Sequence, residues 1–456
     1  MTQQLDAPTF SPEVRSIDDL EHYFHAGAKE RPDWRIGVEY EKPVVFRENG
    51  EAVPYEGPRG IGALLAGLLD RFEWEPVHED GNLVALRDEN ASITLEPGGQ
   101  LEMSGQQCDS LHCAAEELHQ HVEQILTVGD TLGVSFLGLG ITPKTPIERA
   151  PWMPKQRYRI MREIMTRTGK LGHRMMQQTA TVQANFDYGD ERDARRKFRI
   201  AMAMLPVLVA ISANSPIVDG QATGYKSFRA HIWRDTDAQR CGVLPFAFDT
   251  TNVFGAYSAW ALDVPMYFVW RDGRFLPARG MTFRQFLKAG LEGHRATLAD
   301  WATHLTTLFP EARLKTYLEV RAADSQSVEL MLGTPALMKG ILYDDDCLDA
   351  AWDVLRPWTR DERLQAGDDA ARDALDARVH RHRIRDVALE LTAIAREGLQ
   401  RQRRRNGAGK DESIYLEGLA RDVEAGLSPA DRVLRCWNDN EDILDLIRMT
   451  EYRPGN

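Results

Sequence analysis

The sequence has few cysteines and no pattern among them that is typical of a metal site or a disulfide framework. No CxxC pair is present, and the five cysteines are Cys108, Cys113, Cys241, Cys347 and Cys436. An odd, sparse set of this kind makes a disulfide framework unexpected. It favours a protein that works in a reducing compartment.

Long hydrophobic runs are also missing. The longest apolar stretch, residues 200–213, holds 14 residues and includes Pro206, so it is too short to span a bilayer. The first residues lack the charged-then-apolar order of a secretory signal. We therefore expect a cytoplasmic protein with no membrane partner, in which residues 200–213 form a buried helix.

The common nucleotide-binding loops and hydrolase motifs are absent as well. Gly409-Lys410 lacks the upstream glycine of a phosphate loop, and Gly138-Leu139-Gly140 has Pro143 where a dinucleotide fingerprint needs glycine. Neither HExxH nor GxSxG occurs. If ATP binds, it binds by another route.

Charge and size narrow the class of protein further. A formal net charge of −13 argues against unassisted binding of nucleic acid. It does not exclude nucleotides, because bound magnesium can screen their phosphates from an acidic site. With 456 residues, the chain exceeds the size at which single cores stop growing, so we expect one large domain with extensions or two closely packed ones.

The hydrophobic periodicity predicts helices interleaved with strands. In several of these strands, apolar and polar residues alternate strictly. This alternation favours an antiparallel sheet with one polar face over a parallel sheet, and hence an α+β fold. Helices are predicted at 12–30, 59–72, 109–132, 156–168, 191–213 and 297–308, and beyond about 345 to the end; strands are predicted at 134–139, 179–188, 226–234, 263–270 and 315–322. Residues 401–411 form the one plausible surface linker.

Two segments near the N-terminus carry glutamates at strand spacing. In residues 36–42, Glu39 and Glu41 share one face, opposite Val38 and Tyr40. In residues 95–104, Glu96 and Glu102 lie between apolar neighbours on either side of a Pro-Gly-Gly break. Carboxylates that project from one side of a sheet suit magnesium, which prefers hard oxygen ligands and phosphate. The alternative, a polar face exposed to solvent, stays open.

Three other strand-like segments have polar faces rich in Gln, Asn, Arg and Trp but poor in Lys. Their polar residues are Thr181, Gln183, Asn185 and Asp187 in the first, Ser227, Arg229, His231 and Trp233 in the second, and Glu319 and Arg321 in the third. Arginine binds carboxylates and phosphates in a planar, bidentate manner. Together these faces indicate a concave sheet that lines a site for an anionic substrate, a nucleotide and metal. The arginines could instead be surface ion-pair partners, and the tryptophan could belong to the core.

At this point the residues resemble a known family, the glutamate–cysteine ligases of the plant and proteobacterial type. LEPGGQ-x-E-x-SG and SFR-x-HIW-x-DTD are specific signals of that family. The matching stretches occur in the family's order over nearly the whole chain and include 36–42, 92–105, 153–162, 175–188, 196–206, 213–217, 227–249, 261–268, 304–324 and 342–346.

The resemblance implies a fold like the catalytic domain of glutamine synthetase, a curved, largely antiparallel sheet that forms a funnel. It places a catalytic core in residues 1–345 and a helical C-terminal region in residues 346–456. It also implies ATP, magnesium, L-glutamate and L-cysteine as ligands. The γ-carboxylate of glutamate would take the γ-phosphoryl group of ATP, and the amine of cysteine would then displace phosphate to give γ-glutamylcysteine. A monomer or a homodimer is expected.

The resemblance also suggests roles for single residues. The expected magnesium ligands are Glu39, Glu41, Glu96, Glu102 and Glu319. Arg321 is expected at the ATP phosphates, with Gln183 and Asn185 near the same ligand. Arg229 and Trp233 should hold the α-carboxylate end of glutamate, and Arg157 and Thr181 should lie in the same pocket. Tyr267 should help to form the cysteine pocket.

The chain departs from the family pattern at several positions. Tyr40 replaces a histidine between the strand glutamates, and residues 322–326 replace a glycine-rich loop beside the expected nucleotide. The regulatory cysteine pair of the plant enzymes falls at Ala278 and Leu332, so we predict no disulfide switch of that kind. Two alternatives remain: a ligase of the same fold that uses another amine, and a non-catalytic protein that binds an acidic partner through residues 401–405 and Lys410.

Overall fold

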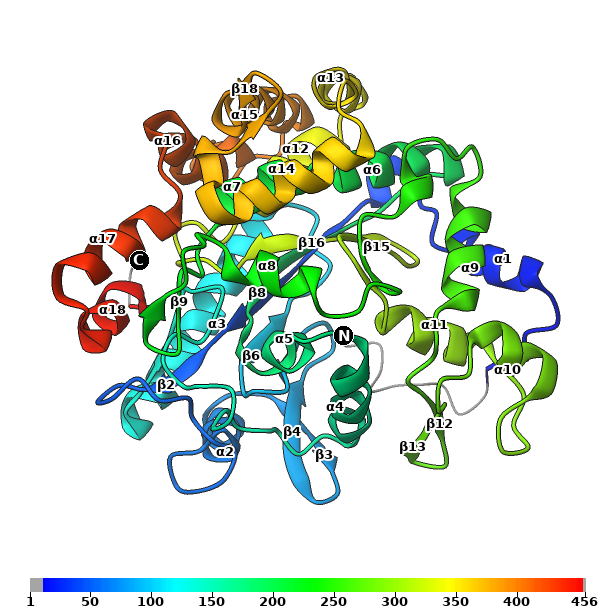
Figure 1. The fold of residues 1–456 in the computed structure, drawn as a ribbon, viewed down its shortest axis with the longest axis horizontal. Coiled ribbons are helices and arrows are strands. Elements are labelled where there is room, and N and C mark those ends of the chain that lie inside the picture. The colour runs from blue at the N-terminus through cyan, green and yellow to red at the C-terminus, as the bar shows by residue number, and fades with distance from the viewer. Residues whose placement is uncertain (1–10, 454–456) are drawn as a thin grey trace.

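An eight-stranded, entirely antiparallel sheet forms the centre of the molecule (Figure 1). The computed structural model describes residues 11–453, without the side chains of 438–440. The strand order is β15 (Ala312–Leu314), β16 (Leu318–Asp324), β8 (Thr181–Phe186), β1 (Ile36–Lys42), β6 (Leu101–Ser104), β5 (Ser92–Leu95), β4 (Asn82–Arg87) and β3 (Glu75–Glu79). The α+β class and the antiparallel sheet predicted from strict alternation are confirmed.

The strand register aligns the predicted polar residues on one face. Glu41 on β1 lies opposite Glu102 on β6, and Glu39 lies opposite Gln183 on β8. On the far side of β8, Asn185 lies opposite Glu319 of β16. Directly opposed residues in a sheet point to the same side, so this row of side chains crosses four strands on a single face.

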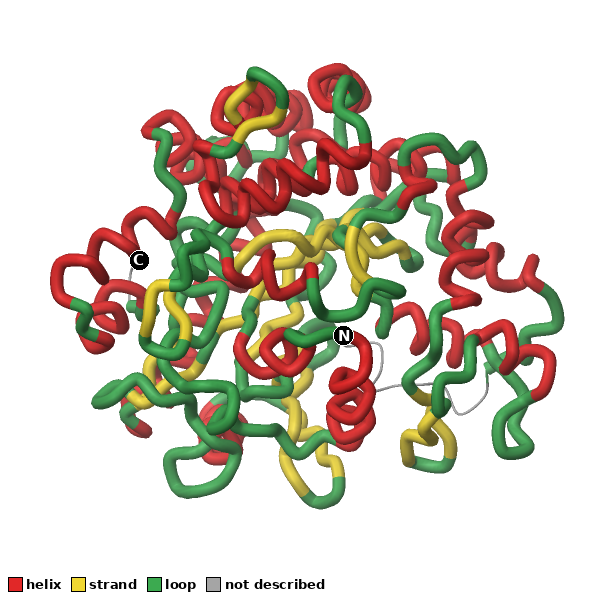
Figure 2. Tube along the Cα trace, in the orientation of Figure 1, coloured by secondary structure: helices red, strands yellow, loops and turns green. Residues whose placement is uncertain are grey.

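Helices surround the sheet (Figure 2). Before residue 345 they are α1 (Ile17–His25), α2 (Ile61–Arg71), α3 (Leu111–Leu132), α4 (Gln156–Thr168), α5 (Gly172–Gln178), α6 (Glu191–Ala203), α7 (Leu205–Ser212), α8 (Phe228–Arg234), α9 (Val253–Asp263), α10 (Phe283–Ala289), α11 (Leu298–Thr306) and α12 (Gly333–Leu342). From there on they are α13 (Asp345–Leu355), α14 (Arg360–Asp373), α15 (Ile384–Gln402), α16 (Glu417–Ala425), α17 (Pro429–Asn440) and α18 (Ile443–Thr450).

Short strands pair outside the large sheet. β2 (Val44–Phe46) pairs with β7 (Val134–Phe136), β9 (Ile217–Val218) with β10 (Gln221–Ala222), β11 (Cys241–Gly242) with β14 (Phe309–Pro310), β12 (Phe268–Arg271) with β13 (Arg274–Pro277), and β17 (Arg378–Val379) with β18 (His382–Arg383). The β11–β14 pair is parallel and joins the loop after α8 to the start of β15.

Local signals explain most helix boundaries. α11 begins at a capping box, in which the Thr297 side chain accepts from the Asp300 backbone N–H and the Asp300 carboxylate accepts from the Thr297 N–H. The single helix predicted over 191–213 is divided into α6 and α7 near Met204. Pro206 lies in the first turn of α7, where its missing N–H costs no helical hydrogen bond.

The strand predicted over 226–234 is wrong, because this segment forms helix α8. Ser227 caps its start by accepting a hydrogen bond from the Ala230 N–H. The alternating pattern gave a wrong prediction, because a helix this short has only about two turns and cannot show a clear 3.6-residue repeat. Arg229 and Trp233, which share a strand face at spacing four, also share a helix face at the same spacing, so their neighbourhood is unchanged.

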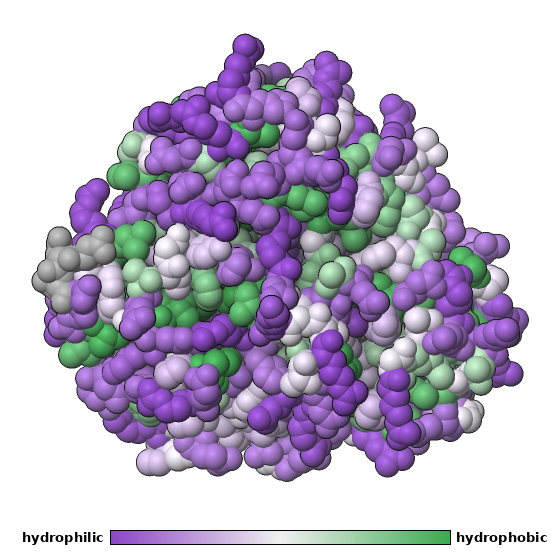
Figure 3. All heavy atoms as spheres, viewed as in Figure 1, coloured by the Kyte–Doolittle hydropathy of each residue, from purple (hydrophilic) through white to green (hydrophobic). Residues whose placement is uncertain are grey.

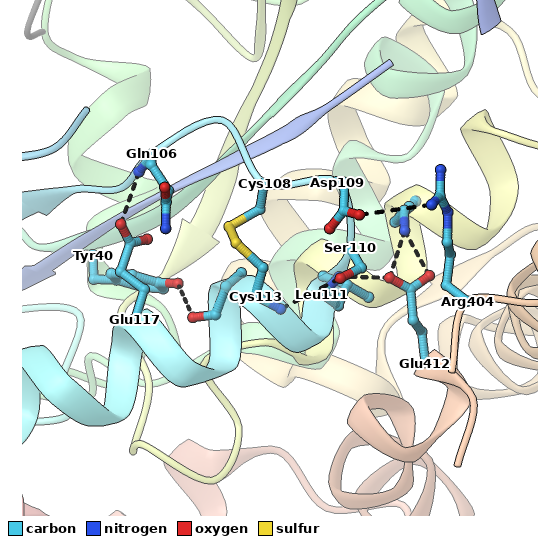
Figure 4. The surroundings of a disulfide bond; sticks show 12 residues. Tyr40, Gln106, Cys108, Asp109, Ser110, Leu111, Cys113, Glu117, Arg404 and Glu412 are labelled. Atoms are coloured by element: carbon cyan, nitrogen blue, oxygen red, sulfur yellow. Dashed lines mark hydrogen bonds and ion pairs between the residues drawn. A yellow bond between two sulfur atoms is a disulfide. The ribbon is translucent and has the colours of Figure 1, made fainter. Parts of the chain in front are cut away.

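One disulfide, between Cys108 and Cys113, departs from the expectation of reduced cysteines (Figure 4). It joins the segment after β6 to the first turn of α3. Cys108 is held against β1 by two backbone hydrogen bonds with Ile36, each 2.8 Å long. Sequence spacing alone could not predict the pair, because it depends on the chain turning back onto the helix start. Ala278 and Leu332 are both buried apolar residues.

The C-terminal helices pack on the rest of the chain through shared clusters of buried hydrophobic residues. The main cluster extends from Leu20 to Tyr452. A smaller second cluster joins α17 and α18 to residues near the N-terminal strands, among them Val45 and Leu137. α12 and α15 cross at two glycines, Gly340 and Gly398, where the backbones touch.

The boundary expected near residue 345 falls between α12 and α13, and the division into core and C-terminal region remains an interpretation of the sequence. The basic linker, residues 401–411, does lie at the surface.

The close crossing of α12 and α15 leads to a prediction about stability. A Cβ atom on Gly398 would lie 2.0 Å from the Gly340 carbonyl oxygen, so Gly398→Ala must push α15 away from α12. We expect the free energy of unfolding to fall by about 1–3 kcal/mol, as in other overpacked cores, measured by chemical denaturation. Gly407→Ala is the matched control, because a Cβ there meets nothing within 4 Å. Equal stability of the two variants would contradict the close crossing.

Candidate active site

Two buried glutamates and one half-buried glutamate meet on the polar face of the sheet. One carboxylate oxygen from each of Glu41, Glu96 and Glu102 lies within 4.8 Å of the others. Glu41 comes from β1, Glu102 from β6, and Glu96 from the first position after β5. One oxygen each of Glu96 and Glu102 has no hydrogen-bond partner. Such a set of hard, crowded oxygen donors fits a divalent cation such as magnesium.

Burial and mutual repulsion raise the pKa of two carboxyl groups in this cluster. Burial, together with the carboxylates of Glu96 and Glu102, raises the pKa of Glu41 well above its ordinary value. Burial and the neighbouring Glu102 raise the pKa of Glu96 to about 7. Like charges in a low-dielectric site disfavour ionisation of each other. A bound cation would reverse both effects, which supports the fit of a metal to these residues.

Glu96 is positioned by the Pro-Gly-Gly turn. Its backbone N–H donates to the Gln100 carbonyl at 2.9 Å, and its carbonyl accepts from the Gly99 N–H at 3.0 Å. Gly99 has a φ of +87°, which favours glycine. Gly98 faces α5, where a Cβ atom would lie 2.0 Å from the Gln177 carbonyl oxygen. Both glycines are therefore required by the local geometry, for different reasons.

Glu39 and Glu319 lie on the same face but outside the three-glutamate cluster. The carboxylate of Glu39 accepts hydrogen bonds from Gln183 at 3.2 Å and Asn185 at 3.0 Å. That of Glu319 is surrounded by cations, with Arg313 at 2.6 Å, Lys315 at 3.1 Å and Arg321 in contact. Burial opposes ionisation of Glu319, but these cations outweigh it and hold its pKa well below the ordinary value. Metal binding by Glu39 and Glu319 stays a prediction.

Arg321 joins the two halves of this row. Its guanidinium donates to Gln183 on β8 and to Glu319 on its own strand. These contacts fix the charge beside the carboxylates, and Gln183 in turn donates to Glu39. The predicted phosphate-binding residues Arg321, Gln183 and Asn185 are thus part of one hydrogen-bonded network.

Arg229 and Trp233 reach the site from α8. The Arg229 guanidinium donates to the carbonyl oxygens of Arg321 at 3.0 Å and Ala322 at 3.3 Å. Asp324, 3.8 Å from this guanidinium, is held by three hydrogen bonds from residues 214, 215 and 227. The Trp233 ring packs against Phe309, and its buried indole N–H has no partner.

The other predicted binding residues divide into two groups. Arg157 and Thr181 line the same cavity as Glu41, and the Thr181 N–H donates to the Glu41 carboxylate at 3.0 Å. Tyr267 does not line this cavity. It is fully buried, with the Arg240 guanidinium 4.0 Å from its ring centroid, whereas its neighbour Phe268 does line the cavity. The expected role of Tyr267 in a cysteine pocket stays a prediction.

Two cavities meet at this row of residues. The central cavity has a polar side and an apolar side. Methionines and aromatic rings form the apolar side, and the polar side is lined by Glu41, Glu96, Arg229, Trp233 and Arg321. The outer cavity, about 500 Å³ in volume, contains Lys29, Arg35, Asn185 and Lys315. Glu39 lines both cavities. An arrangement of two binding spaces with a carboxylate row between them suits the transfer of a group from one ligand to another.

The sequence did not reveal the cationic residues around Glu319. Arg313 lies opposite Glu319 in the β15–β16 pair, and Lys315 follows at the next position of the same face. Arg313 and Lys315 are two positions apart, just before and at the start of the strand predicted at 315–322. That spacing could have indicated two cationic side chains on one strand face. Lys155 was missed because it acts from a helix start, where it donates to the Leu95 carbonyl at 2.9 Å.

Comparison with known proteins finds the family that the sequence motifs resemble, and the match covers most of the chain. The model of Glutamate-cysteine ligase family 2 matches residues 35–449. Glutamate–cysteine ligase B, chloroplastic, of Oryza sativa subsp. japonica is 40% identical over 423 residues, which cover 92% of this chain and 84% of the relative. The chloroplastic glutamate–cysteine ligase of Medicago truncatula is 41% identical, covering 92% and 82%.

A solved structure has the same fold. The glutamate–cysteine ligase of Francisella tularensis, determined in complex with AMP, aligns with a TM-score of 0.55 at 15% sequence identity and covers 92% of this chain and 89% of its own. At that identity the likeness concerns the fold alone.

The cytoplasmic location expected from the sequence is contradicted by these comparisons. The matching relatives are named chloroplastic enzymes, which points to the plastid rather than the cytoplasm. Sparse cysteines indicate a redox preference and do not identify a compartment. Within residues 11–453, no helix is long and apolar enough to cross a membrane, and hydrophilic residues cover most of the face in Figure 3.

The matched length and the identity to these relatives decide the family. The specific motifs predicted from the sequence, LEPGGQ-x-E-x-SG and SFR-x-HIW-x-DTD, both lie within residues 35–449, and their residues line the central cavity through Glu96, Arg229 and Trp233. The chain belongs to Glutamate-cysteine ligase family 2.

Proposed function

We propose that this protein ligates the γ-carboxylate of L-glutamate to the amine of L-cysteine, with ATP as the energy source and magnesium as the metal. The observation that carries the proposal is the row of carboxylates and arginines between two cavities on one sheet face. Family membership supports the ligase chemistry, and the AMP in the Francisella tularensis structure supports a nucleotide ligand.

Glu41, Glu96 and Glu102 are the residues that would hold magnesium. When bound, the ion would supply positive charge to the phosphoryl oxygens and neutralise the carboxylate cluster. The protein's own part is to keep these three oxygens converged, through the Pro-Gly-Gly turn and the Thr181 hydrogen bond to Glu41. Glu39 and Glu319 lie further along the row and would act toward the nucleotide side.

The two cavities suggest where each substrate binds. The outer cavity, with Lys29, Arg35 and Lys315, suits the nucleotide, whose phosphates would point toward Glu39 and Arg321. The central cavity suits glutamate, with its α-carboxylate near Arg229 and Trp233. The γ-carboxylate oxygen would then attack the γ-phosphorus and release ADP, which gives γ-glutamyl phosphate.

In the second step the acceptor amine would attack the activated carbonyl carbon and expel phosphate. No nucleophilic side chain is needed, because positioning and charge stabilisation supply the catalysis. Arg321, held by Gln183 and Glu319, would stabilise the phosphoryl group during transfer. The apolar side of the central cavity, with Met161, Met175 and Phe268, suits the thiol side chain of cysteine.

A second candidate is a ligase that transfers the γ-glutamyl group to a different amine. The same cavity favours a small apolar acceptor but does not select cysteine by a specific polar contact. The non-catalytic alternative loses support, because Arg401 of the basic run is engaged with Glu397 and Asp346, and Arg404 with Asp109. A monomer or a homodimer stays a prediction.

The deciding assay is ADP release with magnesium, ATP and L-glutamate, with and without L-cysteine, and mass identification of the product. We expect cysteine-dependent turnover that yields γ-glutamylcysteine. Glutamate-dependent turnover that cysteine does not stimulate would favour the second candidate and require a screen of other amines. No glutamate-dependent turnover at all would contradict the proposal.

The metal assignment predicts the behaviour of Glu96→Gln and Glu102→Gln. Each removes one anionic ligand, so turnover should fall on the order of 100-fold. Loss of one charge relieves carboxylate repulsion, so the melting temperature without magnesium should be unchanged or higher. The stabilisation by added magnesium, measured by thermal unfolding, should decrease. Glu329→Gln, a change at an exposed glutamate, is the control; near-normal activity in both site variants would refute the assignment.

Arg229→Ala should mainly weaken the binding of glutamate. A charge-assisted hydrogen bond contributes about 1.5–3 kcal/mol, so the KM for glutamate should rise roughly 10- to 100-fold while the KM for ATP changes little. Arg229→Lys keeps the charge but loses the planar fork and should show an intermediate KM. Steady-state kinetics at saturating cysteine test this, and an unchanged glutamate KM in a folded variant would exclude the role.

A further inference from the structure

The edge of the site contains a carboxylate that the proposed mechanism does not use, that of Glu311. It lies between β14 and β15, on the chain segment that supplies Phe309 and Arg313 to the central cavity. Residues 309, 311 and 313 alternate with the same period, and side chains two apart in an extended segment share a face. The position of Glu311 is fixed by backbone hydrogen bonds to Gly242 at 3.1 Å and from Arg321 at 3.2 Å.

The register of the sheet places this side chain beside Arg321. Arg313 lies opposite Glu319 and Ala312 opposite Val320, so Glu311 is opposite Arg321 by continuation. Glu319 and Arg321 belong to the row of active-site residues, and Glu311 therefore extends the row by one strand position. α8, which supplies Arg229 and Trp233, lies next to β16 at this end of the sheet (Figure 1).

A small cavity connects these groups. Its lining includes Arg229, Trp233, Phe309, Glu311 and Arg321, and all of these except Glu311 also line the central cavity. We call it the head-group cavity. It is lined by two kinds of donor and one anionic acceptor, the Glu311 carboxylate; the donors are the Trp233 indole and the side chains of Arg229, Arg234 and Arg321.

Two of these groups lack partners. Among residues 11–453, the Glu311 carboxylate forms no hydrogen bond or ion pair with a protein group, although three arginines act on it electrostatically. The buried Trp233 indole N–H is also unpartnered. A buried donor and a half-buried carboxylate without partners are costly, and such groups usually have a ligand or water. Asp324, by contrast, is fully satisfied by residues 214, 215 and 227.

We propose that Glu311 binds the α-ammonium group of the donor substrate and thereby makes the enzyme select an α-amino acid over a plain dicarboxylic acid. This inference rests on the proposed function. The α-carboxylate and α-ammonium groups are attached to one carbon atom, so their receptors must lie close together. Arg229 and Trp233 supply the donors for the carboxylate, and Glu311 supplies the acceptor for the ammonium group, in the same cavity.

The proposal explains why a carboxylate is found among arginines that bind an anionic substrate. A site that used only Arg229 and Arg321 would bind any dicarboxylate, and an unneeded carboxylate would weaken that binding by repulsion. Selection by a charged acceptor is strong, because a substrate without the ammonium group leaves the half-buried carboxylate of Glu311 unpaired.

The test compares L-glutamate with glutarate, which keeps both carboxylates and lacks the ammonium group. With Glu311→Gln, we expect the KM for glutamate to rise about 10- to 100-fold, since one charge-assisted hydrogen bond is weakened. The inhibition constant of glutarate should stay the same or decrease, so that discrimination between the two ligands falls. Glu311→Asp keeps the charge on a shorter side chain and should restore part of the discrimination.

Glu329→Gln is the control. Glu329 is exposed, pairs with Arg421 and does not line the cavity, so its substitution should leave discrimination unchanged. A folded Glu311→Gln variant with wild-type discrimination would overturn the proposal, as would an equal rise in both constants. Absence of glutamate-dependent turnover in the wild type would instead overturn the proposed function, and thermal shifts with glutamate and glutarate would then test Glu311 separately.

Discussion

Electrostatic repulsion among buried carboxylates is the constraint on which the rest of the site depends. Glu41, Glu96 and Glu102 converge from three elements, and their environment raises the pKa of Glu41 and Glu96. The surrounding structure maintains this unfavourable cluster by rigid means: a sheet register, a two-glycine turn and a backbone N–H from Thr181. Two strands away from Glu41, on β16, the balance is reversed, because Glu319 is enclosed by three cations. One sheet face thus has an end dominated by carboxylates and an end where cations surround a carboxylate.

The sequence predicted the row of polar residues well because period-two alternation survives in a long sheet. Glu39 and Glu41 could be placed on one face from their spacing alone, and the register then places Glu102 opposite Glu41 on the same face. Their grouping into a cluster of three could not be predicted, because Glu96 reaches it through a turn whose path depends on contact with α5. Most of the residues carried over by family resemblance line the central cavity, whereas Glu102, Asn185, Glu319 and Tyr267 do not.

The errors share a physical origin in tertiary contacts that a local pattern does not encode. The segment 226–234 is helical because Ser227 caps it and because Arg229 anchors it on β16. The Cys108–Cys113 pair forms where a loop returns to the start of α3. The role of Arg313 depends on its partner across a hairpin. In each case the deciding interaction joins residues that belong to different elements.

The contact between Gly98 and Gln177 has a consequence for how this site can vary. The turn that positions Glu96 rests directly on the backbone of α5, with no room for a single methyl group. Any displacement of α5 must therefore move a carboxylate of the cluster. Substitutions that reshape the pocket wall through Met175 or Met176 on α5 must preserve the path of that helix. The shape of this cavity can therefore change through the side chains of α5, but not through a shift of its backbone.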